Sequence, residues 1–291
     1  MKIVIIGTSG RLGAALLREY RDKFEVTGFN RAQLDLSNSD GARERLRSTD
    51  FDVLINAAAF TNVDGCETER DRAFLINAEA PGVLAKIAND KGARLIHFST
   101  DYVFDGEKRA PYTEEDRANP ISAYGESKLA GENNVLAMGN GHLVVRVSWV
   151  FGPDRPSFID GIIKRAQENE QVAAIADKFS TPTYTLDIAK MLPRFFTRGG
   201  DYGGTLHFAN SGRCSWQEYG QWALDCCHEA GVPLKARTVG ACKLRDMTAW
   251  VAHRPVYSVL SAAKYTELTG TSPRTWRDAV SDYITRFYSK K

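Results

Sequence analysis

Tyr124 and Lys128 lie four residues apart and carry groups that can perform acid–base chemistry together. On a helix, residues i and i+4 share one face, so the lysine ammonium would lie near the phenol. A free tyrosine has a pKa of about 10, and a nearby cation favours the phenolate, which brings proton exchange with a carbonyl or alcohol oxygen closer to neutral pH. The pair alone is also typical of a solvated helix face, so its interpretation depends on what precedes it.

A glycine-rich turn near the start of the chain has the character of a cofactor loop. Gly7, Gly10 and Gly13 follow an apolar run and open a helical pattern, with Arg11 and Leu12 inside the turn. Glycine lets the backbone turn sharply and approach a pyrophosphate, whose charge is favoured by the N–H groups of a helix amino terminus. The spacing is GxxGxxG rather than GxGxxG, and a simple strand-to-helix connection is the alternative. We expect dinucleotide binding here.

The end of the second apolar run bears on the choice of cofactor. Asn30 and Arg31 stand where an acidic residue would accept a hydrogen bond from the ribose 2′-hydroxyl of NAD, and Arg31 can pair with a 2′-phosphate instead. This favours NADPH and leaves NADH open. Asp35 and Leu36 either border the adenine or form a turn. Small side chains that leave space for a cofactor, or simply pack tightly, follow the third run at Ala57, Ala58 and Ala59.

The elements that must position these residues alternate along the chain. Apolar runs predict strands over Lys2–Ile6, Glu25–Phe29, Val53–Ala58, Arg94–Ser99 and His142–Val150. Helical patterns lie between them, over Leu12–Tyr20, Ser39–Leu46, Asp71–Asn89 and Ser122–Met138. Strands separated by helices imply right-handed crossovers, so we expect an α/β fold with a doubly wound, Rossmann-like parallel sheet.

The pattern becomes less regular after Val150, which predicts a smaller substrate-binding domain over residues 151–291 beside a cofactor-binding domain over 1–150. Segments near 184–210, with a helix over Tyr184–Phe196 and a strand over Thr205–Asn210, are expected to return to the first domain. The remaining predicted helices cover Phe158–Asn169, Trp216–Glu229 and Thr275–Phe287.

Composition narrows the function classes. With 43% hydrophobic and 25% charged residues and a net charge of +2, the chain lacks the overall field that nucleic acid or membrane binding would require. An odd number of cysteines without ligand spacing, and no signal or membrane segment, predict a cytoplasmic protein. No histidine spacing indicates a metal, and His97 and His207 are interpreted as structural. The charge runs Arg43–Arg47 and Glu67–Arg72 are interpreted as solvated helix faces.

The combination of motifs resembles the extended short-chain dehydrogenase/reductase superfamily and, within it, the dTDP-4-dehydrorhamnose reductase family. The resemblance spans nearly the whole chain. It rests on the segments AAAFTNVD at Ala57–Asp64, STDYVF at Ser99–Phe104, YGESKLAGE at Tyr124–Glu132, RVSWVFG at Arg146–Gly152 and RPVYSVL at Arg254–Leu260.

The resemblance implies roles for several residues. Thr100 would help to hold the substrate carbonyl oxygen, Tyr124 would donate the proton, and Lys128 would orient the cofactor ribose and favour the tyrosinate. Substrate-binding residues would include Thr61, Asn62, Ser99, Asp101, Trp149 and Arg254. Each has a plainer interpretation as well: turn chemistry for Thr61 and Asn62, capping for Ser99, a core position for Trp149 and a solvated cation for Arg254.

These features predict an NADPH-preferring reductase of the C4 keto group of a nucleotide-linked deoxysugar, with dTDP-4-dehydro-L-rhamnose as the leading substrate. Tyr102 follows Asp101 where superfamily dehydratases carry a second acid, which weighs against dehydration. Two alternatives stay open: a reductase of another nucleotide sugar or small ketone, and a non-catalytic regulatory subunit like that of methionine adenosyltransferase. The expected partner is a nucleotide sugar, with a homodimer left open.

Overall fold

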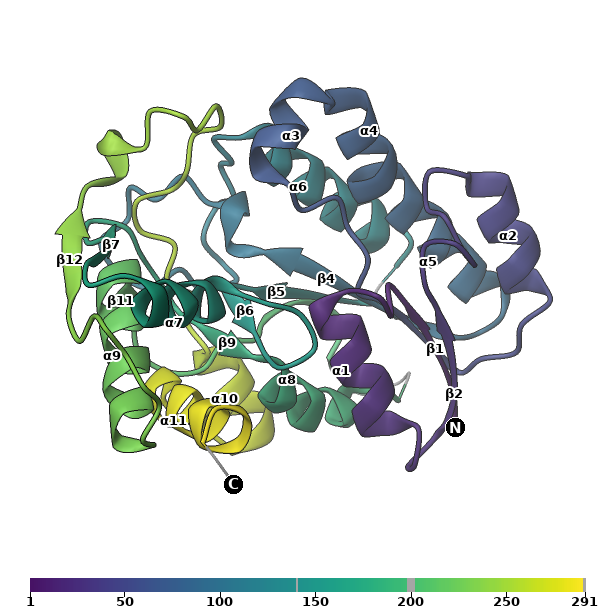
Figure 1. Cartoon of the computed structure of the whole chain (residues 1–291). Helices are drawn as coiled ribbons and strands as arrows, with labels where there is room; N and C mark the ends of the chain where they lie inside the picture. Colours follow the sequence, from purple (N-terminus) through teal and green to yellow (C-terminus); the bar gives the residue numbers. More distant parts are fainter. Residues whose placement is uncertain (140, 198–201, 290–291) are drawn as a thin grey trace.

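A parallel sheet forms the centre of the protein in a computed structural model that describes residues 1–139, 141–197 and 202–289 (Figure 1). Within these residues it has six strands, in the spatial order β2-β1-β3-β4-β5-β10. Their bounds are β1 Lys2–Ile6, β2 Glu25–Phe29, β3 Val53–Asn56, β4 Arg94–Thr100, β5 Leu143–Val147 and β10 Gly204–His207. Each neighbouring pair is parallel, which confirms the predicted α/β fold class.

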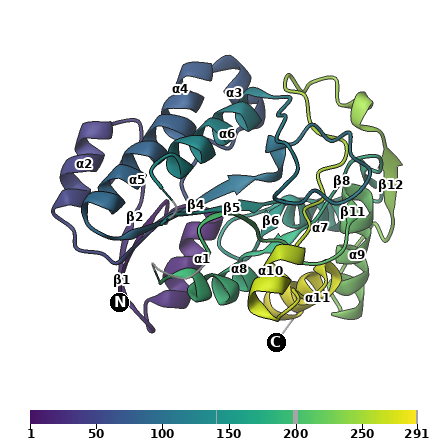
Figure 2. The same cartoon turned by 180° about the vertical axis from the view of Figure 1, so that it is seen from behind.

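Helices cover both faces of this sheet, as Figures 1 and 2 show from opposite sides. They include α1 Arg11–Tyr20, α2 Ser39–Arg47, α5 Ala80–Asp90, α6 Ala123–Leu136 and α8 Thr185–Met191. Side chains alternate along a strand, so Ile3 and Ile5 of β1 pack in the core with α1 and α8, whereas Val4 and Ile6 pack with α2 and α5. Burial of each such side chain stabilises the fold by about 1.5–3 kcal/mol.

The strand order places the ligand crevice. The chain runs outward from β1 to β2 on one side and from β3 to β10 on the other, so the connections diverge between β1 and β3. Ligands of such sheets bind outside the carboxyl ends of the strands at this point of divergence. The glycine turn after β1 and the small residues after β3 both lie there, because their strands are adjacent.

The strands predicted over Val53–Ala58 and Thr205–Asn210 end earlier than expected, at Asn56 and His207, and two further predicted elements differ more. The strand predicted over His142–Val150 ends at Val147, because Trp149 has a φ of 39° and breaks the extended backbone; Val150 and Phe151 then form β6. The helix predicted over Asp71–Asn89 is divided in the structure into α4 (Arg70–Phe74), a short π-helix (Leu75–Glu79) and α5. A short helix that was not predicted, α3 (Val63–Thr68), precedes it.

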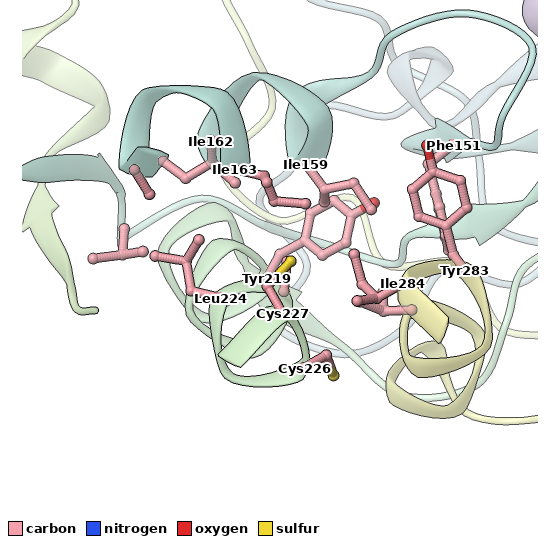
Figure 3. Packing of buried hydrophobic residues seen from close by; sticks show 14 of the residues in the cluster. Phe151, Ile159, Ile162, Ile163, Tyr219, Leu224, Cys226, Cys227, Tyr283 and Ile284 are labelled. Atoms are coloured by element: carbon pink, nitrogen blue, oxygen red, sulfur yellow. The ribbon is translucent and has the colours of Figure 1, made fainter. Parts of the chain in front are cut away.

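The C-terminal part has a core of its own, built by α7 (Phe158–Glu168), α9 (Trp216–Glu229) and α11 (Trp276–Phe287), close to the predicted bounds. Figure 3 shows Ile159, Ile162 and Ile163 of α7 facing Tyr219 and Leu224 of α9. Short paired strands here were not predicted: β7 Val172–Ile175, β8 Phe179–Ser180, β9 Thr183–Tyr184, β11 Cys214–Ser215 and β12 Val239–Cys242. The helix α10 covers Ala263–Thr269.

The segment predicted to return to the first domain contains α8, a 3-10 turn over Leu192–Phe195, and β10. β10 pairs with β5, and α8 packs in the same core as α1. Residues 198–201 of this segment lie outside the described residues. The division into two domains near residue 150 stays a prediction. The remaining 3-10 turns cover Asp101–Val103 and Leu244–Asp246.

Candidate active site

A cleft of about 630 Å³ opens at the carboxyl ends of β1, β3 and β4. The residues that line it extend from Ile6 to Val150, so they come from the predicted cofactor-binding part of the chain. Most of the predicted site residues lie in this wall: Gly7, Gly10, Arg11, Leu12, Arg31, Asp35, Leu36, Ala57, Ala58, Ala59, Thr61, Ser99, Thr100, Asp101, Tyr124, Lys128 and Trp149. Gly13, Asn30, Asn62 and Arg254 do not appear in it.

The glycine turn is held by backbone contacts that only glycine permits. Gly7 has a φ of 90°, in the left-handed region, and a Cβ there would lie 2.8 Å from the Ala58 nitrogen. A Cβ on Gly13 would lie 2.2 Å from the Gly7 carbonyl oxygen. Gly13 therefore lets α1 approach β1 closely without itself facing the cleft. Gly10 is the residue before α1, whose free N–H groups point to the cleft end of the helix.

Arg11 has a different environment from the one expected for a phosphate-binding side chain. Its guanidinium donates to the carbonyl oxygens of Val150, at 3.0 Å, and of Arg155, at 3.0 Å, and also to that of Pro156. Arg155 in turn donates to the Ser9 carbonyl at 2.9 Å. Arg11 thus ties the glycine turn to the loop after β6, although its side chain also lines the cleft.

The end of β2 presents an exposed cation to the cleft. Arg31 donates from Nε to Asp35 at 3.3 Å, and both side chains line the cleft. Asp35 also accepts from Ser37, and these hydrogen bonds lower the pKa of its carboxyl. Asn30 does not line the cleft, and its side chain accepts from the Gln33 backbone N–H at 3.1 Å; its cofactor contact stays a prediction. Arg31 remains able to meet a phosphate.

Tyr124 lies in the first turn of α6 because Ser122 starts that helix by accepting from the Gly125 N–H. Its ring meets that of Tyr102 edge to face, with centroids 5.6 Å apart. Burial of the hydroxyl raises its pKa above the ordinary value, while hydrogen bonding to Thr100 acts in the opposite direction. Tyr124 is therefore protonated at neutral pH, as a proton donor must be.

Lys128 is buried one turn further along α6. Its Nζ donates to the Phe98 carbonyl at 2.7 Å and lies 3.3 Å from Nε2 of His97. Burial lowers its pKa to about 8, with Glu132 acting in the opposite direction. Burial is the largest influence on the pKa of the Tyr124 hydroxyl. The expected effect of Lys128 on that pKa stays a prediction.

Asp101 sits at the floor of the cleft, 2% exposed, where the two parts of the chain meet. It accepts from Thr100 at 3.2 Å, from Ser180 at 3.1 Å and from Ser258 at 2.5 Å. Burial raises its pKa, and Lys178 opposes that shift. This network aligns Thr100 next to Tyr124. Sequence reasoning missed Ser180, Ser258 and Lys178, because no local pattern links residues so far from Asp101 in the chain.

Trp149 has a strained backbone in the wall of the cleft. Among the described residues, Trp149 is the only non-glycine residue with a positive φ. Its indole N–H is buried and has no hydrogen-bond partner among these residues. The buried ammonium group of Lys178 lies 6.0 Å from its ring centre and 5.2 Å from that of Tyr102. Trp149 both lines the cleft and packs against the core of the C-terminal part, so its contact with a ligand stays a prediction.

Two predicted substrate residues are occupied elsewhere. Arg254 donates to both oxygens of Asp64, at 3.1 and 2.8 Å, and its side chain is 8% exposed. Its guanidinium also stacks over Trp250, 3.9 Å from the ring centre. Asn62 caps α3 by accepting from the Gly65 N–H at 3.0 Å. Asn62 therefore has the turn role that was the plainer interpretation, whereas Arg254 could meet a diphosphate only by sharing its bond to Asp64.

Arg72 and Phe60 also line the cleft, with the guanidinium 4.8 Å from the ring centre. Arg72 pairs with Glu69 at 2.5 Å and its side chain is 39% exposed, as a solvated helix face predicts, although it also contacts the loop after β3. No three acidic, histidine or cysteine side chains in the described part of the chain form a group that could hold a metal ion. Of the helices in the described residues, none has the length and apolarity needed to cross a membrane.

Comparisons with known proteins agree on one family. The family model described as "RmlD substrate binding domain" matches residues 1–289. The dTDP-4-dehydrorhamnose reductase of Escherichia coli (strain K12) is 33% identical over 298 residues, covering 99% of each chain. A probable dTDP-4,6-dihydroxy-2-methyloxan-3-one 4-ketoreductase of Streptomyces antibioticus is 34% identical, covering 97% of this chain and 94% of the other. The crystal structure of a dTDP-4-dehydrorhamnose reductase from Bacillus anthracis in complex with NADP superposes with a TM-score of 0.90, at 30% identity, covering 98% of this chain and 99% of the other.

Proposed function

Because the chain belongs to the RmlD substrate-binding family, in which dTDP-4-dehydrorhamnose reductases are found, we propose that it uses NADPH to reduce dTDP-4-dehydro-L-rhamnose to dTDP-L-rhamnose. The observation that carries this proposal is the meeting of Thr100, Tyr124 and Lys128 in the cleft that begins at the glycine turn. These are the groups needed to polarise a ketone oxygen and to protonate it.

The cleft fits a dinucleotide. The close approach of Gly7 and Gly13, with Gly10 just before α1, lets the backbone at the start of that helix meet a ligand, which suits a pyrophosphate. Arg31 supplies an exposed cation for a 2′-phosphate, and Ala57 to Ala59 leave room beside it. NADPH, when bound, supplies the hydride. Preference for NADPH over NADH is supported by the lack of an acid at the end of β2.

The protein's own part in the reaction follows from the geometry. Asp101 accepts from Thr100 and so fixes its hydroxyl beside Tyr124. On substrate binding the Thr100 hydroxyl would turn its proton from Asp101 to the ketone oxygen of the sugar, and Tyr124 passes its own proton to that oxygen as charge develops on it. The raised pKa of Tyr124 keeps this proton in place until that moment. Trp149 offers a ring face to the sugar or the base.

Dehydration of the sugar has less support than reduction. It would need a second free acid after Asp101, but the side chain there is Tyr102, whose raised pKa keeps its hydroxyl protonated. Asp101 itself is held by two serines of the C-terminal part. A different nucleotide sugar is a second candidate, since the Streptomyces antibioticus relative is a probable ketoreductase of another substrate linked to dTDP. A regulatory subunit is disfavoured because it would need no proton donor.

Residues 1–150 with β10 hold the cofactor in this proposal, and residues 151–291 mainly hold the substrate. The cleft lining from Ile6 to Val150 supports the first half of this division, and the contacts of Ser180 and Ser258 with Asp101 support the second. Free cysteines support the predicted cytoplasmic location. The homodimer stays a prediction that the mass of the protein in solution will decide.

A panel of 4-keto nucleotide sugars, each offered with NADPH and with NADH, tests the function. Loss of nicotinamide absorbance is followed at fixed enzyme concentration. We expect the fastest turnover with dTDP-4-dehydro-L-rhamnose and NADPH. Faster turnover with another sugar would favour the second candidate, and no turnover with any would contradict the reductase assignment.

A further inference from the structure

A chain of buried hydrogen bonds connects the loop after β3 to Lys128. The Ala58 N–H donates to Oδ1 of Asn56 at 3.1 Å. Nδ2 of Asn56 lies 3.1 Å from Nδ1 of His97, and Nε2 of His97 lies 3.3 Å from Nζ of Lys128. Asn56 and His97 are fully buried, so water cannot repair a mismatch between two donors.

The donor and acceptor roles in this series of hydrogen bonds are fixed at the end formed by Ala58. A backbone N–H can only donate, so the Asn56 atom facing Ala58 must be its oxygen, and the amide nitrogen then faces His97. Nδ1 of His97 must therefore accept. A neutral imidazole with Nδ1 as acceptor carries its proton on Nε2, which turns that N–H toward Lys128.

An ammonium group on Lys128 conflicts with this arrangement. Nε2–H would face a group that has only donors, whereas a neutral amine offers a lone pair to His97 and still donates to the Phe98 carbonyl. Every donor and acceptor in this series of hydrogen bonds has a partner only when Lys128 is neutral. Protonating Lys128 would require His97 to move its proton to Nδ1 and the Asn56 amide to turn over, which would leave the Ala58 N–H without its acceptor.

We propose that His97 is a positioning residue: it donates from Nε2 to Lys128, favours the neutral amine, and couples the protonation of Lys128 to the cofactor-facing loop Ala57–Ala59. That loop lines the cleft, and Ala58 packs directly against Gly7. The relevance of Lys128 to hydride transfer rests on the proposed function, whereas the tautomer of His97 does not.

Other charges near Lys128 do not oppose this assignment strongly. Glu132 on the same helix favours the ammonium form, but its carboxylate accepts three hydrogen bonds from Arg146 of β5, at 3.0, 3.2 and 2.6 Å. Tyr124, also on α6, is protonated and neutral. From β4, His97 itself stays uncharged, since burial and Lys128 hold its pKa well below the usual value.

The tautomer can be observed directly. Two-bond ¹H–¹⁵N correlation spectra of the full-length protein labelled with ¹⁵N-histidine distinguish Nε2–H from Nδ1–H rings, and loss of one signal set in His97→Gln assigns His97. With no ligand added, we expect a neutral ring with its proton on Nε2 at pH 9, above the pKa of about 8 that burial gives Lys128. A ring protonated on Nδ1, or an imidazolium, would overturn the proposal.

Asn56→Asp is the matched variant, because it keeps the side-chain shape and replaces the donor by an acceptor. The new carboxylate can still accept from the Ala58 N–H while its second oxygen accepts from Nδ1–H, so His97 should switch to Nδ1–H and accept from a Lys128 ammonium. The pH at which Lys128 loses its proton, measured from the dependence of the rate on pH, should then rise by about one pH unit or more. Retention of Nε2–H in this variant would also refute the proposal. If the variant does not fold, the wild-type spectrum alone decides, and it does so without any substrate.

Discussion

Arg254 and Asp64 join the C-terminal part of the chain to the helix after β3 through two charge-assisted hydrogen bonds, at 3.1 and 2.8 Å. The same carboxylate accepts from the backbone N–H groups of Val251 and Ala252, each at 2.9 Å. One acidic side chain therefore fixes the course of residues 251–254 beside the loop after β3, where Thr61 and Val63 form part of the cleft wall.

Asp64→Asn should loosen this segment and weaken substrate binding. The variant removes the negative charge from all of these hydrogen bonds, so we expect KM for the nucleotide sugar to rise several-fold and stability to fall by about 1 kcal/mol. NADPH affinity should change little. The matched control is Asp40→Asn, which removes an exposed pair with Arg43. An unchanged KM would show that the segment does not shape the substrate site.

The same contact should respond to acid. Hydrogen bonding from Arg254 lowers the pKa of Asp64 to about 2, below its ordinary value of 3.8. The stabilisation is therefore fully present above about pH 4 and is lost as the pH falls toward 2. Urea unfolding of the wild type and of Asp64→Asn across this range measures it, and two parallel pH profiles would contradict the lowered pKa.

Tyr124→Phe should remove the proton donor and keep the cleft. We expect kcat to fall by about 10²–10⁴-fold, the usual contribution of a general acid, while the dissociation constant of NADPH stays within about threefold. Tyr202→Phe is the matched control, because Tyr202 donates to the Leu268 carbonyl away from the cleft. Steady-state kinetics and fluorescence titration with NADPH measure the two effects. Wild-type turnover in Tyr124→Phe would exclude this residue as the donor.

Arg31→Ala should change the choice of cofactor rather than the chemistry. A guanidinium that meets a 2′-phosphate contributes only to NADPH, so KM for NADPH should rise by about tenfold or more while KM for NADH stays nearly constant. Arg43→Ala removes an arginine of α2 that does not line the cleft and serves as the control. An equal rise of KM for NADPH and for NADH would show that Arg31 does not contact the 2′-phosphate.

Gly13→Ala should distort the glycine turn by a steric clash on the side that does not face the cleft. The new Cβ would lie 2.2 Å from a backbone oxygen of Gly7, which cannot rotate away, so we expect a loss of more than about 2 kcal/mol in stability and a weaker NADPH complex. Gly161→Ala is the control, because a Cβ there meets nothing within 4 Å in α7 and should stabilise the helix by up to about 1 kcal/mol. Denaturant unfolding of both variants measures the difference. Equal stabilities would mean that α1 can move away from β1.

Two buried lysines should make stability depend on pH in the alkaline range. Burial lowers the pKa values of Lys128 and Lys178 to about 8, below their unfolded value of 10.5. The unfolded chain then binds more protons between these values, so stability should rise as the pH increases above 8. Lys178→Met should reduce this slope by about 1.4 kcal/mol per pH unit, measured by urea unfolding between pH 8 and 9.5. An unchanged slope would contradict the lowered pKa of Lys178.

Local patterns predicted the elements of the sheet well. β1, β2 and the glycine turn follow from short apolar runs, Gly7 and the helix that begins at Arg11, all of which lie next to one another in the chain. The break at Trp149 could not be predicted, because no local pattern indicates its positive φ or the contacts of its ring with Trp216 and Tyr219. The short strands of the C-terminal part carry too few residues to show a period.

Some residues of the candidate site could be predicted from local sequence, and others could not. Thr100, Tyr124 and Lys128 could be named because each lies in a recognisable segment. Asp101's partners Ser180 and Ser258 could not, since only the folded chain brings them together. The burial of Lys128 could not be predicted from its spacing to Tyr124, and it lowers the pKa of the lysine because desolvation disfavours the charged form.

Deuterium transfer from NADPH to the sugar tests the central claim most directly. The enzyme is given dTDP-4-dehydro-L-rhamnose with NADPH deuterated at either face of nicotinamide C4, and the product is examined by NMR. We predict that one of the two labelled cofactors places deuterium on C4 of the sugar, and that Tyr124→Phe slows this transfer. Consumption of NADPH with deuterium from neither face appearing at that carbon would contradict the assignment of this cleft to ketone reduction.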